Sequence, residues 1–109
     1  MKTTLLRLTL LALPLCLVAC GRPAPTDAAL AQAKNCLGCH ALDRKVVGPA
    51  FKDVAAKYAG DTGAAARLAN KIRAGGSGVW GPVPMPANGQ VSETEAAQLA
   101  AWVLSQKTQ

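Results

Sequence analysis

The chain has 109 residues, with 12 basic and 6 acidic side chains and a formal net charge of +6. This length allows at most one domain, and the scattered positions of the basic residues argue against nucleic-acid binding. Two tryptophans, one tyrosine and one phenylalanine leave a small core, which an exported domain of this size usually supplements with a disulfide, a metal or a covalently held cofactor.

Residues 1–19 have the organisation of an export signal. Two basic residues precede an apolar stretch that includes Cys16, and this stretch is too short to span a bilayer comfortably. The letters LVAC, which end at Cys20, resemble the lipobox of bacterial lipoproteins. Cys20 is therefore predicted to carry a lipid anchor, with residues 20–27 as a short tether before the domain of residues 28–109. Ordinary signal cleavage, which would release a soluble protein, is the alternative.

Four helices and no strand are predicted after the signal, which makes the domain all-α. The last helix begins with the letters SETE, in which Ser92 and Glu95 match a capping box. Of the other three helices, the first is rich in good helix formers, the second can begin at a proline and end at a glycine, and the third ends at a glycine. The predicted helices cover residues 27–36, 49–60 and 62–75 and a segment that begins at Ser92. The loop of residues 75–90 contains too many Gly and Pro residues for a helix, and a loop of this length usually has a function.

The segment NCLGCHAL places Cys36, Cys39 and His40, the only histidine, close together. This is the pattern of covalent c-type haem attachment, in which two thiols add to the vinyl groups and the histidine binds the iron. A zinc site would be one ligand short. A thiol–disulfide oxidoreductase would place the pair at a helix start beside a sheet, and a plain disulfide leaves the histidine without a role. We therefore predict one covalently attached haem c with its iron.

Met85 is the only methionine after the initiator, and it lies in the unexplained loop within the letters GPVPMPANG. The flanking prolines restrict the backbone, which lowers the entropy lost when the thioether is held against iron. Cytochromes that only carry electrons hold the iron from both sides, commonly with His and Met. We therefore predict His40 and Met85 as axial ligands and no catalytic residue. A methionine that merely fills a gap is the alternative.

With these residues identified, the chain resembles a short bacterial class I cytochrome c, of the type that donates electrons to the cytochrome cd nitrite reductase. The resemblance runs from Ala28 to Lys107 and rests on the motifs CLGCH, VGPAFKDVAAKYAG, GVWGPVPMPAN and AAWVLSQK. It implies the class I cytochrome c fold, with about four short helices wrapped around one haem.

The resemblance also implies supporting contacts. Pro49 would lie against the ligand histidine, with a nearby carbonyl accepting a hydrogen bond from the free imidazole nitrogen. The indole N–H of Trp80 would donate to a haem propionate, and Asn88 would contact the sulfur of the ligand methionine. Relatives often have an arginine near the inner propionate where this chain has Lys71, so that contact is expected to be weaker, with Arg73 sharing it.

The predicted function is one-electron transfer between respiratory redox proteins in the periplasm, with no small-molecule substrate and attachment to a membrane through Cys20. A nitrite reductase, a terminal oxidase, a peroxidase and a quinol-oxidising complex are the candidate partners. Basic residues near the haem motif would steer an acidic partner; they are Lys34, Arg44, Lys45, Lys52 and Lys57. If Met85 did not bind, the alternative would be a five-coordinate sensor or a peroxidase-like protein. Without haem, the cysteines would form a dithiol pair.

Overall fold

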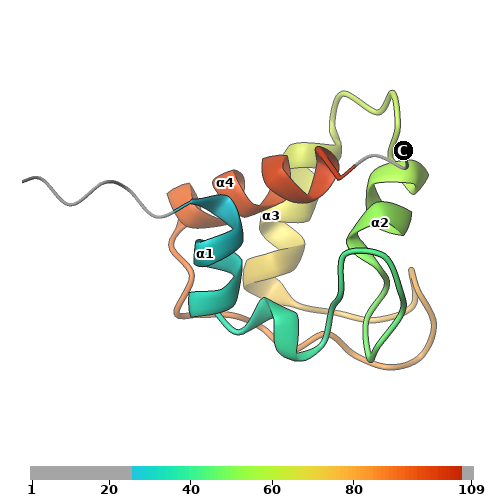
Figure 1. Cartoon of the computed structure of the whole chain (residues 1–109), viewed down its shortest axis with the longest axis horizontal. Helices are drawn as coiled ribbons and strands as arrows, with labels where there is room; N and C mark the ends of the chain where they lie inside the picture. Colours follow the sequence, from blue (N-terminus) through green and yellow to red (C-terminus); the bar gives the residue numbers. More distant parts are fainter. Residues whose placement is uncertain (1–25, 107–109) are drawn as a thin grey trace, which may run out of the picture.

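The structure is a computed structural model that describes residues 26–106. Within this range it has four α-helices, one 3-10 turn and no strand, so the predicted all-α class is confirmed (Figure 1). The elements are α1 (Asp27–Ala33), η1 (Cys36–Gly38), α2 (Phe51–Lys57), α3 (Ala64–Ala74) and α4 (Glu93–Leu104). The predicted export signal and Cys20 lie outside the described residues. Among the helices of residues 26–106, none has the length and apolar character needed to cross a membrane.

Helix α1 is shorter than predicted. It begins as expected after Thr26, whose hydroxyl accepts a hydrogen bond from the backbone N–H of Ala29 at 3.3 Å. It ends at Ala33 and not at Cys36, because Asn35 adopts the left-handed conformation with φ 61°. Asparagine is one of the few residues that tolerate this conformation. Cys36 therefore belongs to the separate turn η1.

Helix α2 begins at Phe51, so the prediction that it opens on Pro49 was wrong. Its first backbone N–H groups have partners in the preceding loop: the N–H of Phe51 donates to the Ala41 carbonyl at 2.9 Å and that of Lys52 to the Leu42 carbonyl at 3.0 Å. Free N–H groups at a helix start need such partners. These two bonds fix the loop that follows the cysteine motif against α2.

Helix α3 begins and ends close to its predicted positions, and α4 begins close to its predicted start. Helix α3 ends before Gly75, whose φ of 69° suits glycine at a helix end. Helix α4 begins with the predicted capping box: the Ser92 hydroxyl accepts from the Glu95 N–H at 3.2 Å, and the Ser92 N–H donates to the Glu95 carboxylate at 2.9 Å. These local signals are sufficient to place both ends.

The core lies where α4 packs against α1, α2 and α3. Figure 1 shows α4 along one side of the molecule, with α1 and α2 at opposite ends. One buried cluster joins α1 to α4 through Leu30 and Leu99, and a second joins α2 to α4 through Phe51, Val54 and Val103. The 3-10 turn and the two long loops lie on the side away from α4. They are thus available to enclose a cofactor.

Acid is expected to destabilise the fold through Glu95. The hydrogen bond from the Ser92 backbone, and then the contact with Lys34, hold the pKa of Glu95 below its ordinary value. A carboxylate with a lowered folded-state pKa contributes stability above its unfolded pKa and loses it as the pH falls through the folded value. Below about pH 4.3, the free energy of unfolding should therefore fall more steeply for the wild type than for Glu95→Gln. Urea unfolding at a series of pH values measures this, and parallel curves would contradict it.

Candidate functional site

A cavity of about 660 Å³ lies between the loop after the cysteine motif, α2, α3 and the long loop after α3. A second cavity of about 280 Å³ adjoins it. Cys39, His40 and Met85 line both cavities, and much of the remaining lining is aliphatic or aromatic. Cofactor sites in proteins typically occupy about 300–1,000 Å³ and are mostly apolar. The larger cavity has the size and character of such a site.

His40 is held in one orientation and one tautomer. Its Nδ1 lies 2.8 Å from the carbonyl oxygen of Pro49. Because a carbonyl can only accept, Nδ1 carries the hydrogen and Nε2 keeps its lone pair for a metal. The ring of Phe51 stacks on the imidazole, with 5.0 Å between centroids and 17° between planes. The predicted position of Pro49 against His40 agrees with this geometry, and Pro49 itself supplies the carbonyl.

Gly48 is a site residue that the sequence interpretation missed. A Cβ atom at this position would lie 2.8 Å from His40 Nδ1 and 2.9 Å from Nε2, and closer still to Cε1. Its backbone N–H also donates to the Cys39 carbonyl at 2.8 Å. Only a residue without a side chain lets the imidazole lie this close to the loop. The signal was present in the letters VGPAF, as a glycine directly before the proline.

Cys36 and Cys39 are free, partly buried thiols: Cys36 is the first residue of η1, and Cys39 follows the turn directly. Cys36 lines the smaller cavity and Cys39 both. Burial raises the pKa of the Cys36 thiol, whereas a dithiol oxidoreductase needs a cysteine whose pKa is lowered. Among residues 26–106, no three His, Cys, Asp or Glu side chains converge as a metal site would require. The arrangement of side chains therefore does not support a zinc site, and burial does not favour Cys36 as a reactive thiol.

Met85 is fixed by its backbone. Its N–H donates to the Gly76 carbonyl at 2.9 Å, and its carbonyl accepts from the Gly76 N–H at 2.9 Å. Gly75 packs against the same strand-like segment: a Cβ there would lie 2.7 Å from the Ala87 nitrogen and closer still to the Met85 oxygen. The flanking prolines alone did not reveal this contact. The end of α3 thus holds the methionine at the wall of both cavities.

Asn88 joins the segment that follows Met85 to α3 by hydrogen bonds. Its side-chain amide donates to the Ile72 carbonyl at 2.9 Å and to the Pro86 carbonyl at 3.2 Å. Its backbone N–H donates to the Arg73 carbonyl at 3.1 Å. Asn88 and Met85 both line the smaller cavity. The contact of Asn88 with the methionine sulfur stays a prediction.

The two residues predicted to contact a propionate, Trp80 and Lys71, both line the larger cavity. Trp80 is 42% exposed, and the Lys57 ammonium lies 5.4 Å from its ring centroid. Arg73, which was expected to share this task, instead pairs with Glu93 at 3.0 Å and is not among the cavity residues. Lys71 is therefore the better placed of these two cations, and both propionate contacts stay predictions.

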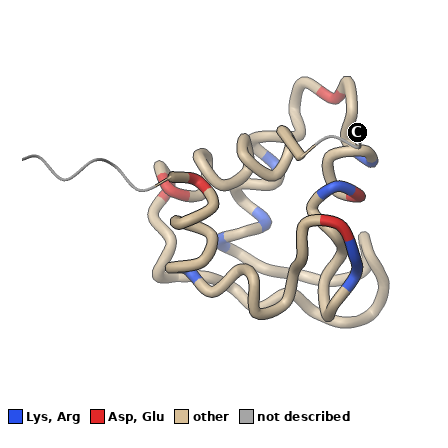
Figure 2. Tube along the Cα trace, viewed as in Figure 1, with Lys and Arg blue, Asp and Glu red and all other residues tan. Residues whose placement is uncertain are grey.

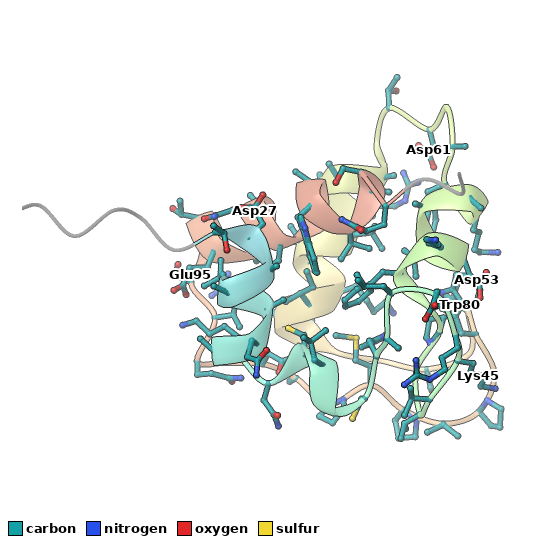
Figure 3. All side chains as sticks on the ribbon, in the orientation of Figure 1. Asp27, Lys45, Asp53, Asp61, Trp80 and Glu95 are labelled. Atoms are coloured by element: carbon teal, nitrogen blue, oxygen red, sulfur yellow. The ribbon has the colours of Figure 1, made fainter. Side chains whose placement is uncertain are left out.

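Charged residues lie at both ends of the molecule (Figure 2), and Asp53 lines the larger cavity. Acidic residues gather near the starts of α1 and α4, and Asp27 and Glu95 lie at the opposite end of the molecule from Lys45 and Trp80 (Figure 3). Lys45 lines the larger cavity. Lys34, predicted as a steering residue, pairs with Glu95 at 2.9 Å and its side chain is only 20% exposed. It does not belong with the basic residues near the cavity mouth.

Comparisons with known proteins agree with this geometry. Residues 28–107 match the family model described as Cytochrome c. The chain is 57% identical over 91 residues to cytochrome c-551 of Pseudomonas aeruginosa, covering 84% of this chain and 86% of that protein. It is 55% identical over 84 residues to cytochrome c-552 of Nitrosomonas europaea, covering 77% and 82%. The crystal structure of Nitrosomonas europaea cytochrome c552 superposes with a TM-score of 0.72 at 55% identity, over 73% of this chain and 99% of that one.

Proposed function

The chain belongs to the cytochrome c family, and we propose that it carries single electrons between redox proteins. It has the class I cytochrome c fold and one covalently bound haem c. When bound, this group supplies a reversible Fe(II)/Fe(III) couple. The relatives are themselves small cytochromes c, which supports a carrier and not an enzyme.

In this proposal Cys36 and Cys39 would hold the haem through two thioether bonds, and His40 and Met85 would bind its iron. One observation carries the assignment. His40 and Met85 line both cavities. The imidazole of His40 is held by the Pro49 carbonyl, and the backbone of Met85 is held by the backbone of Gly76. Two ligands fixed in this way leave no open position for a substrate.

The residues around the ligands suit rapid electron transfer. The Pro49 carbonyl keeps the proton on Nδ1 of His40, so the ligand nitrogen remains basic. The paired bonds between Gly76 and Met85 hold the backbone from which the thioether extends. The inner lining is apolar and includes Val54, Leu68 and Ile72. Little therefore has to move when an electron arrives or leaves.

The surface near the cavity mouth supports docking of a redox protein. Apolar side chains that line the larger cavity are exposed there, and they are Val47, Val79, Trp80 and Val83. Lys45 lines the cavity and Lys57 lies over Trp80, so an acidic partner would approach with a salt-dependent association rate. The candidate partners in electron transfer are a nitrite reductase of the cytochrome cd type, a terminal oxidase, a peroxidase and a quinol-oxidising complex.

The proposed location is the periplasm, with a membrane anchor at Cys20. The export signal and the LVAC letters support it. Cell fractionation tests the anchor: recovery of the protein with membranes agrees with lipidation, and recovery in the soluble periplasmic fraction contradicts it.

Voltammetry combined with carbon monoxide titration tests the carrier function. The wild type should give one reversible one-electron wave, and its reduced form should not bind carbon monoxide at neutral pH, because Met85 occupies the sixth position. Tight carbon monoxide binding would instead identify a five-coordinate sensor or a peroxidase-like protein.

A further inference from the structure

A salt bridge beside the cysteine motif is linked to the segment that follows Met85. Lys34 lies at the C-terminal end of α1. Its ammonium donates to the backbone carbonyl of Gln90 at 3.1 Å and lies 2.9 Å from the Glu95 carboxylate. Glu95 is itself fixed by the capping box of α4. The Lys34 ammonium therefore contacts two oxygen acceptors, and one of them, the Gln90 carbonyl, belongs to the loop of residues 75–90 that contains Met85.

From Gln90 a short series of hydrogen bonds leads back to the methionine. The side chain of Gln90 donates to the Asn88 side-chain oxygen at 3.2 Å. Asn88 in turn donates to the carbonyl of Pro86, the residue next to Met85, at 3.2 Å. Lys34, Asn88, Gln90 and Met85 all line the 280 Å³ cavity. Lys34 and Met85 thus line the same cavity.

We propose that Lys34 is a positioning residue for Met85. Residues 86–91 form neither helix nor strand, so side-chain contacts add to the backbone bonds of Met85 and Asn88 in keeping the loop in the ligating arrangement. An external ligand can take the place of Met85 only if this segment moves, and movement breaks the charge-assisted bond from Lys34 to the Gln90 carbonyl. Lys34 thereby opposes loss of the methionine. The inference rests on the proposed function, in which Met85 binds the iron.

Imidazole binding to the oxidised holoprotein tests the inference, with Lys34→Met as the variant. Methionine keeps the length and apolar character of the lysine stem but removes the charge and the donors. Because an exposed hydrogen bond typically changes an equilibrium constant by a factor of about two to ten, Lys34→Met should bind imidazole roughly three- to tenfold more tightly than the wild type. Lys34→Arg, which keeps the charge, should recover part of the wild-type resistance.

Asp27→Ala is the matched control. Asp27 also joins α1 to α4, by accepting a bond from the Gln98 side chain at 2.7 Å, but it lines neither cavity. The Asp27→Ala variant should have a lower free energy of unfolding than the wild type and the same affinity for imidazole. If Lys34→Met lowers stability to a similar extent and its imidazole affinity equals that of the wild type, the positioning role is wrong. If the wild type binds imidazole as tightly as Met85→Ala, Met85 is not a ligand and the proposed function fails as well.

Discussion

Replacing Met85 by alanine is expected to lower the reduction potential by on the order of 100 mV, within the range of about 0.8 V over which axial ligands set haem potentials. A thioether raises the potential of haem iron. Its removal favours the oxidised state and vacates the sixth position. Voltammetry measures the first effect. Carbon monoxide binding to the reduced protein, absent in the wild type, measures the second.

Val83→Ala is the control for this prediction. Val83 lies in the same loop and is 61% exposed, so its truncation changes the loop without touching the proposed ligand. Its potential should match that of the wild type. If Met85→Ala also keeps the wild-type potential and binds no carbon monoxide, Met85 loses its assigned role and another group must hold the iron.

Gly48→Ala is expected to disturb the histidine side of the site. The added methyl group would lie within 2.9 Å of both imidazole nitrogens, so the ring or the loop must move and the bond from Nδ1 to the Pro49 carbonyl is strained or lost. Overpacking costs about 1–3 kcal/mol and a lost hydrogen bond about 1 kcal/mol. We expect the free energy of unfolding of the holoprotein to fall by about 2–4 kcal/mol, measured with guanidinium.

Gly89→Ala provides the comparison. No atom lies within 4 Å of a Cβ at that position, so the substitution changes mainly the entropy of the unfolded chain, an effect of at most about 1 kcal/mol. If the free energy of unfolding falls no more for Gly48→Ala than it changes for Gly89→Ala, the close approach of Gly48 to His40 does not contribute to stability.

The two sides of the site are held by different means. His40 stacks on Phe51, which is 5% exposed and belongs to the buried cluster with Val54 and Val103. Met85 is held by a pair of backbone hydrogen bonds at the edge of an exposed loop. Moving the histidine therefore disturbs the core, whereas moving the methionine breaks only a few loop contacts. The methionine side is the one from which ligand exchange should begin.

Local sequence signals predicted much of this arrangement. The cysteine–histidine motif, the capping box of Ser92 and Glu95, and the glycine at the end of α3 each depend on residues a few positions apart. Composition and periodicity were sufficient for an all-α domain. The family resemblance added the class I fold and the position of Pro49 against His40.

Contacts between distant segments could not be predicted in the same way. Cys36 was placed in a helix because nothing in the neighbouring letters shows that Asn35 turns left-handed. The closeness of Gly48 to the imidazole depends on how the loop folds back. Lys34 was grouped with the steering residues by its nearness to the motif, whereas its partners, Gln90 and Glu95, lie more than fifty residues away. Such pairings are set by tertiary packing.

The central claim is that Cys36 and Cys39 hold a haem c whose iron is bound by His40 and Met85. Optical spectra of the exported protein, oxidised and reduced, test it most directly when followed by denaturation and extraction of any free haem. The account predicts haem that stays with the chain, a sharp α-band on reduction, and the weak far-red band of methionine-bound ferric iron. Covalent haem without the far-red band would contradict the role of Met85, and extractable or absent haem would contradict that of the cysteines.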